Sequence, residues 1–336
     1  MKTTNGFHIV EIPIPVPLKT VNGYLSKSEA GWHLIDTGFH TADGRAAWKQ
    51  AFRELRIAPQ DMAEIVVTHF HPDHSGLSGW LQEYTGAPVK ISTGGKRLAY
   101  ELWVGKKEAE CFPEFAFQYG MGVESREKIS AYLEAFPENV LPLPDFTTFE
   151  EGERFDWAGE EYVAIETPGH ADGHMVFYSA LSGTVVAGDL LLPKITPNVG
   201  SFPGFHPNPL KAFIQSLRKV KGLRLETVLP GHRELYRNGN RRADELIEHH
   251  QARLAEIVTE HVKGPSTVQG ISELLFPFLS VRSSPLQLLF AFEETLAHLI
   301  YLEEEGFLRR EVSRNGIVTF ERVNKNEREI FVLPQT

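Results

Sequence analysis

The sequence contains a single cysteine, Cys111, among its 336 residues. An intramolecular disulfide is therefore impossible, and metal clusters held by several thiolates are excluded. The sequence also lacks an excess of positive charge, because 34 lysines and arginines stand against 44 aspartates and glutamates. The resulting formal net charge of −10 provides no general electrostatic attraction to nucleic acid or to an anionic membrane.

Long apolar runs are missing as well. No segment approaches the roughly 18 apolar residues that are needed to cross a bilayer. Residues 1–18 lack the apolar core and the small-residue cleavage site of a signal peptide. We therefore expect a cytoplasmic protein without membrane contact. Hydrophobic residues make up 42% of the chain and charged residues 23%, which is typical of a globular protein with one large core or two domains.

Extended and helical patterns alternate along the chain. Residues 7–36 have the short apolar runs and turn signals of a β-meander. Residues 43–56 have apolar positions at helical spacing, and residues 63–69 (AEIVVTH) predict a buried strand. A further series of strands is predicted from residue 147 onward. This mixture predicts layers of α and β structure.

Residues 94–140 have mostly helical patterning and many large apolar side chains, such as Trp103, Phe112, Phe115 and Phe117. We interpret this segment as a helical cap inserted into a catalytic domain that spans residues 1–262. The aromatic side chains either pack the cap onto the body of that domain or line a cleft for an apolar part of a substrate.

Residues 263–336 predict a separate small domain. Two or three helices are followed by a β-hairpin with Asn315-Gly316 at its turn, an order similar to that of a winged-helix fold. From residue 241 to the end, 11 lysines and arginines stand against 15 aspartates and glutamates, which weakens a nucleic-acid role for this domain. Packing, homodimerisation or binding of another partner are the roles that remain.

The stretch VTHFHPDHSG places four metal-binding side chains within six positions: His69, His71, Asp73 and His74. They lie where the predicted buried strand ends and a helix begins. In such a turn His69 and His71 can face one point, whereas Asp73 and His74 can face a second point a few ångströms away. A set of capping and solvated polar residues is the alternative interpretation, but it explains neither the density nor the spacing of these groups.

Three further candidates each follow an apolar strand and a glycine. They are His170 in ETPGHADGH, Asp189 in VVAGDLL and His232 in TVLPGHREL. Each turn can bring one side chain to the same edge of a sheet, where α/β folds usually bind ligands. We therefore expect these three side chains to complete a metal site together with the histidine cluster.

H-x-H-x-D-H with later TPGH, GD and PGH segments resembles the metallo-β-lactamase superfamily. LIDTG at residues 34–38 matches a motif that precedes the histidine cluster in that family. The resemblance covers roughly residues 7–260, interrupted by the 94–140 insertion. It implies an α/β fold, the αβ/βα four-layer sandwich, in which two mixed sheets face each other with helices outside. Within the family, the chain looks similar to hydroxyacylglutathione hydrolases and related members.

Carried over position by position, the resemblance implies a site for two divalent metal ions. His69, His71 and His170 would hold the first ion, and Asp73, His74 and His232 would hold the second. Asp189 would bridge both, and Asp36 would fix the ligand loop without touching metal. Zinc is the expected metal, with iron or manganese as alternatives, because imidazole and carboxylate suit all three.

A water that bridges two such ions is expected to lose a proton near neutral pH, since water on zinc has a pKa of about 7. The hydroxide would attack a carbonyl or phosphoryl group polarised by one metal. Asp73 would act in catalysis by transferring a proton to the leaving group, because its carboxylate lies beside the nucleophile.

Three other residues are candidate substrate contacts, each with an alternative interpretation. Lys194 can bind an anionic group or be a plain surface lysine. His174 can contact metal or substrate or be a buried, hydrogen-bonded histidine at the start of a strand. His206 can contact substrate or be a solvated residue of the proline- and glycine-rich loop 193–209.

We predict a metal-dependent hydrolase of a small-molecule thioester, ester or lactone. The alternative is a phosphodiesterase or ribonuclease of the same superfamily, which the negative charge disfavours. A secreted β-lactamase is disfavoured by the lack of an export signal. A lactonase with a catalytic phenol is in doubt because no tyrosine follows Asp189 in GDLLLP.

Overall fold

The computed structural model describes residues 2–323, and the chain forms two compact units. Unit 1 comprises Met1–Gly105, Phe136–Pro197 and Ser216–Ala243. Unit 2 comprises Lys106–Ala135, Asn198–Gln215 and the chain from Asp244 onward. The units are defined by packing and divide the chain elsewhere than at the predicted boundary between residues 262 and 263. That boundary stays a prediction, and residues 324–336 of the predicted C-terminal domain lie outside the described part.

Unit 1 contains a seven-stranded sheet in which the strands follow chain order. The strands are β1 (Lys2–Thr4), β2 (Phe7–Pro13), β3 (Thr20–Ser28), β4 (Gly31–Ile35), β5 (Met62–Val66), β6 (Val89–Ser92) and β7 (Phe146–Phe149). Pairing is antiparallel from β1 to β4 and parallel from β4 to β7. The predicted β-meander and the buried strand at β5 are confirmed.

A second sheet of unit 1 has six strands in the order β13-β12-β11-β10-β9-β8. The strands are β8 (Arg154–Trp157), β9 (Glu160–Glu166), β10 (Met175–Ser179), β11 (Thr184–Gly188), β12 (Thr227–Pro230) and β13 (Tyr236–Arg237). Only β11 and β12 pair in parallel. Both sheets are therefore built largely from hairpins, with parallel strands where helices intervene.

An apolar core joins the two sheets of unit 1. Phe7, Tyr24 and Val66 of the first sheet belong to one buried cluster with Trp157 and Tyr162 of the second. The rings of Phe7 and Tyr162 meet edge to face, with centroids 5.5 Å apart, a favourable geometry for aromatic pairs. This packing holds the sheets face to face, as expected for the predicted sandwich.

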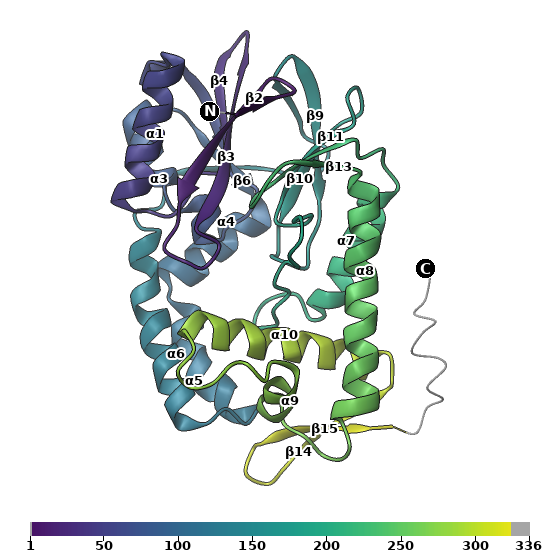
Figure 1. The fold of residues 1–336 in the computed structure, drawn as a ribbon. Coiled ribbons are helices and arrows are strands. Elements are labelled where there is room, and N and C mark those ends of the chain that lie inside the picture. Colours follow the sequence, from purple (N-terminus) through teal and green to yellow (C-terminus); the bar gives the residue numbers. More distant parts are fainter. Residues whose placement is uncertain (1, 324–336) are drawn as a thin grey trace. The chain divides into compact units, whose positions relative to one another are not determined.

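Short helices complete unit 1 (Figure 1). They are α1 (Ala42–Leu55), the 3-10 turn η1 (Pro59–Asp61), α2 (Pro72–Ser75), α3 (Ser78–Thr85), α4 (Thr93–Ala99), the π-turn η2 (Tyr100–Val104) and the 3-10 turn η3 (Phe136–Asn139). Helix α1 begins because the Thr41 hydroxyl accepts the Gly44 N–H, and it ends at Arg56 in the left-handed region. Its Trp48 is fully buried. Among the described residues, no helix has the length and apolar character that a membrane-spanning segment needs.

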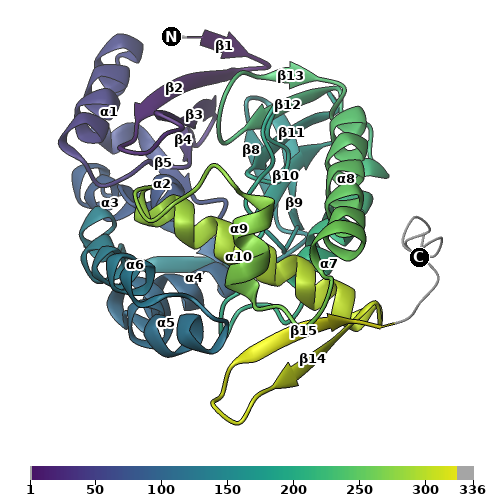
Figure 2. The same ribbon diagram turned by 60° about the horizontal axis from the view of Figure 1, so that its bottom comes forward.

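Two helices pass from one unit into the other: α7 (Pro209–Lys221) and α8 (Gly239–Glu256). Unit 2 also contains α5 (Lys107–Gln118), α6 (Val123–Ala135), the π-turn η4 (Ile257–His261), α9 (Val268–Leu275), α10 (Pro285–Glu304), and the strands β14 (Leu308–Val312) and β15 (Val318–Arg322). The latter two form the predicted hairpin (Figure 2), whose turn contains Gly316 at φ +79°. A winged-helix assignment stays a prediction.

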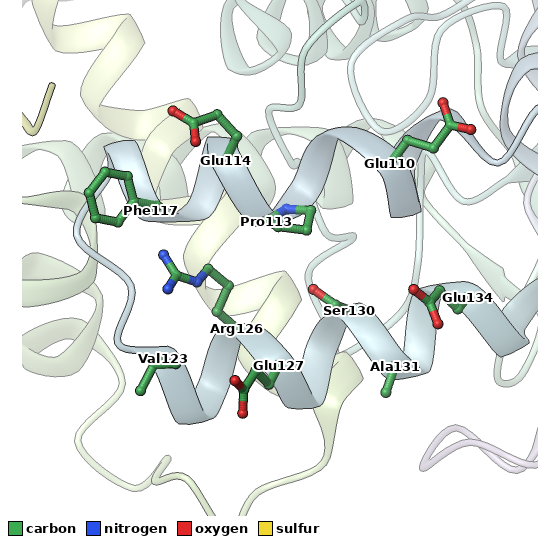
Figure 3. A pocket seen from close by; sticks show the side chains of 10 residues that line it. All are labelled: Glu110, Pro113, Glu114, Phe117, Val123, Arg126, Glu127, Ser130, Ala131 and Glu134. Atoms are coloured by element: carbon green, nitrogen blue, oxygen red, sulfur yellow. The ribbon is translucent and has the colours of Figure 1, made fainter.

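The helices predicted for residues 94–140 are present, and their buried aromatic residues pack within the unit to which each belongs: Trp103 lies against Phe70 in unit 1. Phe112 and Phe115 of α5 are buried, and the Phe115 ring lies 5.1 Å from that of Phe202 and 6.0 Å from that of Phe292. This favours the packing interpretation of these side chains. The open groove between α5 and α6 is lined by four glutamates and by a single aromatic ring, that of Phe117 (Figure 3).

Candidate metal centre

Seven predicted metal ligands of unit 1 lie directly after strands or in the short helix α2. His69 and His71 follow β5, and Asp73 and His74 belong to α2. His170, Asp189 and His232 follow β9, β11 and β12. The described structure brings them together in three overlapping groups, each compact enough to hold a metal ion: His69, His71 and His170; His69, His74 and Asp189; and Asp73, His74 and His232.

The first group consists of three imidazole nitrogens. Nδ1 of His71 lies 3.1 Å from Nε2 of His69 and 3.0 Å from Nε2 of His170. Nitrogens around a tetrahedral zinc ion are separated by about 3.3 Å, since each Zn–N bond is about 2.0–2.1 Å long. The spacing of the three nitrogens is therefore close to what one metal ion requires.

The second group combines two imidazoles with a carboxylate. Oδ2 of Asp73 lies 3.1 Å from Nε2 of His232 and 3.9 Å from Nε2 of His74. Both histidines are fully buried, whereas the Asp73 side chain is 17% exposed. Asp73 is thus the member of this group that solvent or a bound molecule can reach.

The carboxylate of Asp189 lies between the two groups. Its Oδ1 is 3.3 Å from Nε2 of His74, and its Oδ2 is 3.5 Å from Nε2 of His232 and 3.6 Å from Nε2 of His170. One carboxylate thus faces histidines of both groups. This is the placement that a bridging ligand needs.

Three histidines make hydrogen bonds through Nδ1, so Nε2 is the nitrogen that faces the other candidate ligands. Nδ1 of His69 is 2.9 Å from the Thr68 hydroxyl, Nδ1 of His74 is 2.8 Å from Oδ2 of Asp36, and Nδ1 of His232 is 2.8 Å from the Thr20 carbonyl. The Asp36 carboxylate and the Thr20 carbonyl only accept, so Nδ1 of His74 and His232 carries the proton. The Thr68 hydroxyl donates to Asp36 and so accepts from His69.

A test of fit comes from atoms that have no partner. In residues 2–323, Nε2 of His74, Nε2 of His232 and Oδ1 of Asp189 are buried without a hydrogen bond. Buried polar atoms without partners are destabilising by about 1–3 kcal/mol each. Each of the three atoms belongs to a residue of the groups that could hold a metal ion, so the residues fit the ions that the resemblance implies.

Two histidines of the cluster have pKa values that are shifted in opposite directions. Burial lowers the pKa of His232, but Asp189 and Asp73 outweigh it and raise that pKa to about 10. Burial and the neighbouring histidine His170 instead lower the pKa of His71 to about 3. One group therefore tends to bind protons and the other to exclude them. Metal binding at the second group must displace a proton from His232.

Two glycines make room for the ligands. A β-carbon on Gly231 would clash with Oδ1 of Asp189 and lie 2.7 Å from Cε1 of His74. Gly188 has φ +46°, and a β-carbon there would lie 2.6 Å from Nε2 of His174. The glycines beside the predicted ligands are thus explained by close approach of the side chains around Asp189.

Residues 16–232 match the family model described as "Metallo-beta-lactamase superfamily". The chain belongs to the metallo-beta-lactamase superfamily. Residues 254–323 match a second model, "Metallo-beta-lactamase-like, C-terminal domain", so the C-terminal region is also of a kind known beside this fold. The predicted fold class is confirmed.

Known members of the metallo-beta-lactamase superfamily resemble the chain over most of its length. A metallo-beta-lactamase family protein of Thermus thermophilus superimposes with a TM-score of 0.84, is 35% identical and covers 95% of this chain and 99% of its own. "Probable metallo-hydrolase YqjP" of Bacillus subtilis (strain 168) is 25% identical over 90% of this chain and 94% of its own. "Atrochrysone carboxyl ACP thioesterase" of Aspergillus fumigatus is 24% identical over 73% of this chain and 61% of its own. These matches identify the chain as a metallo-hydrolase of the superfamily.

The remaining predicted residues have different surroundings. Asp36 accepts hydrogen bonds from His74 and Thr68, and its predicted role in fixing the ligand loop stays a prediction. His174 is fully buried, which does not support a substrate contact. Lys194 is 77% exposed and lies 3.4 Å from Glu234. His206 belongs to unit 2, where its Nδ1 accepts the Asn208 N–H. The substrate contacts of these two stay predictions.

The threonines around the candidate ligands were not among the predicted site residues. Thr68 orients His69, Thr20 binds His232 through its carbonyl, and Thr167 binds His174. A threonine directly before a metal-binding histidine was the one visible signal, and it applies only to Thr68. The Thr20 contact involves a backbone atom 212 positions away from His232, so no local pattern reveals it.

Proposed function

We propose that this metallo-hydrolase is a dinuclear enzyme that cleaves a small-molecule thioester, ester or lactone. The observation that carries the proposal is the position of Asp189, whose two carboxylate oxygens face histidines of both groups. We assign one metal ion to His69, His71 and His170 and the other to Asp73, His74 and His232, with Asp189 shared by both. Zinc is the metal that we expect, and iron or manganese are the alternatives.

Two such ions supply Lewis acidity: when bound, they polarise a carbonyl oxygen and acidify water. The chain's own residues then divide the remaining tasks. The histidine ligands are oriented by Thr68, Asp36 and the Thr20 carbonyl. Asp73 is the more exposed of the two ligand carboxylates, at 17% against 9% for Asp189. We assign Asp73 the transfer of a proton to the leaving group for this reason.

A carboxylic (thio)ester is favoured over a phosphodiester by charge. The chain carries a net charge of −10. Arginines of the C-terminal hairpin are engaged with carboxylates, since Arg309 lies 2.6 Å from Glu321 and Arg310 lies 2.6 Å from Glu303. They offer little free positive charge to a phosphate backbone. A relative that is described as a thioesterase supports the same substrate class. The cytoplasmic location and a homodimer remain expectations from the sequence.

A substrate panel tests the proposal. Purified, metal-loaded enzyme is assayed with an acyl thioester, a lactone, an aryl ester and bis-nitrophenyl phosphate, and Asp189→Ala is the negative control. We expect turnover of at least one acyl substrate that Asp189→Ala loses. Turnover of the phosphodiester without any acyl hydrolysis would instead establish the alternative, a phosphodiesterase.

A further inference from the structure

His174 lies immediately behind the metal centre, although it belongs to none of the groups that could hold a metal ion. It precedes β10 and is fully buried. Its Nε2 accepts the backbone N–H of Asp189 at 3.1 Å. Its Nδ1 lies 2.8 Å from the Thr167 hydroxyl. Its ring centroid is 4.9 Å from that of His69.

These contacts determine the tautomer of His174. A backbone N–H can only donate, so Nε2 must be the unprotonated nitrogen. In a neutral ring Nδ1 then carries the proton and donates it to the Thr167 hydroxyl oxygen. Thr167 is itself fixed, since its N–H donates to the His174 carbonyl at 2.8 Å. The ring is therefore held at both ends in a single orientation.

His174 binds the backbone nitrogen of Asp189, the residue whose carboxylate forms the proposed bridge. Asp189 directly follows Gly188, whose left-handed φ of +46° ends the β11 strand. A turn of this kind has other available conformations because glycine restricts it little. The bond from the Asp189 N–H to His174 selects one of them. Nε2 of His174 also packs so closely on Gly188 that a β-carbon would not fit there. This contact further restricts the conformation of the turn.

We propose that His174 is a positioning residue that fixes the backbone of Asp189 and thereby sets where the shared carboxylate lies between the two metal sites. The inference rests on the proposed dinuclear site. The Asp189 carboxylate faces both groups, so loss of the His174 acceptor is expected to weaken the binding of both metal ions. Substitutions behind metal ligands typically reduce affinity about 10–100-fold.

Two variants separate this role from simple packing. His174→Leu replaces the imidazole with an apolar side chain of similar size and removes the acceptor of the Asp189 N–H. His174→Gln places a carbonyl oxygen near the position of Nε2 and restores it. His33→Leu is the matched control, because His33 is also buried in unit 1 but is bonded to Ser28 and Glu64. Metal-free protein is titrated with Zn²⁺ against a competing chelator, and thermal unfolding is followed in parallel.

We expect two ions for the wild type, at least roughly tenfold weaker binding for His174→Leu, and affinity within about threefold of the wild type for His174→Gln. His33→Leu should lower the unfolding temperature without changing Zn²⁺ affinity. Unchanged affinity in folded His174→Leu, or equal weakening in both His174 variants, would overturn the inference. A wild type that binds two ions but cleaves no panel substrate would overturn the proposed function alone.

The tautomer provides a second test that needs neither metal nor a stable variant. Long-range ¹H–¹⁵N NMR spectra of the wild type distinguish the two neutral forms of an imidazole. We expect the proton of His174 on Nδ1. A proton on Nε2 would be incompatible with a bond from the Asp189 N–H and would overturn the inference, even if His174→Leu fails to fold.

Discussion

Nδ1 of His74 lies 2.8 Å from Oδ2 of Asp36, and both side chains are buried. The same carboxylate accepts the Thr68 N–H and the Thr68 hydroxyl, and that hydroxyl accepts from His69. Asp36 therefore orients one histidine of each proposed metal site. It does so from φ +60°, an uncommon conformation, at the turn after β4.

Asp36→Asn should weaken metal binding while leaving all seven ligands in place. The amide keeps one acceptor but turns a donor toward groups that also donate, so either His74 or Thr68 loses its partner. We expect Zn²⁺ affinity to fall by about 10–100-fold, measured by chelator competition. Asp43→Asn, at an exposed position of α1, is the control and should behave as the wild type. Equal affinities for both variants would show that Asp36 does not orient the ligands.

Gly231→Ala should reduce metal content because its new methyl group would meet Asp189 and His74. The ligand carboxylate must move, and neither site then has its full set of donors. We expect fewer than two ions per chain and a loss of activity of at least roughly tenfold. Gly122→Ala provides the comparison, since a β-carbon there meets nothing within 4 Å. Full metal content in Gly231→Ala would mean that the turn can relax without disturbing Asp189.

Glu64 should stabilise unit 1 in a pH-dependent way. Burial raises its pKa, but hydrogen bonds from His33 and Trp157 and the charge of Lys90 outweigh this and hold the pKa at about 2. The folded-state pKa is below the unfolded value of 4.5, so this stabilisation is complete above about pH 4.5 and is lost as the pH falls toward 2.

Glu64→Gln is therefore expected to lower the free energy of unfolding by on the order of 2 kcal/mol at pH 7, and by progressively less below pH 4.5. Denaturant unfolding at several pH values measures this difference. Glu153→Gln is the matched control: Glu153 is more exposed, and its carboxylate lies 3.5 Å from the same lysine, Lys90. A constant difference at all pH values would contradict the titration.

The pair His250 and His298 should make unit 2 sensitive to acid. His298 donates from Nδ1 to the Glu294 carbonyl at 2.7 Å, so its Nε2 accepts from Nδ1 of His250 at 3.1 Å. Burial lowers the pKa of His298 to about 4. The unfolded chain binds this proton near pH 6.5 and the folded chain does not, so stability falls between pH 6.5 and 4.

His298→Gln keeps an acceptor for His250 and removes the titration of the imidazole at position 298. We expect the unfolding free energy of the variant to decline less steeply than that of the wild type between pH 6.5 and 4, by on the order of 3 kcal/mol over the interval. Metal-free samples of both proteins make the comparison independent of the metal centre. Parallel curves would contradict the assignment of two neutral histidines.

The convergence of the seven candidate ligands could be predicted from sequence because each of them lies in a short motif near the end of a strand. His170, Asp189 and His232 each follow a glycine, and the topology brings such strand ends to one edge. His174 shows the limit. Its position before an apolar run indicated that it starts a strand. Its partner, the Asp189 N–H, is a backbone group that no side-chain pattern reveals.

The division into units was not predictable for a related reason. Phe115 packs on Phe202 and Phe292, which are distant in the chain and belong to segments that were interpreted separately. Apolar periodicity indicates that each segment buries one face, but not which other segment covers it. The helices of the 94–140 segment were therefore expected, whereas their packing partners were not.

The number of divalent ions bound per chain distinguishes a dinuclear centre from a site for a single ion. Protein reconstituted with Zn²⁺ and freed of excess metal is analysed by mass spectrometry alongside His71→Ala and His232→Ala. We expect two ions for the wild type and about one for each variant, because each substitution removes a ligand of a different group. A single ion in the wild type, or two ions in both variants, would contradict a dinuclear centre built from these seven side chains.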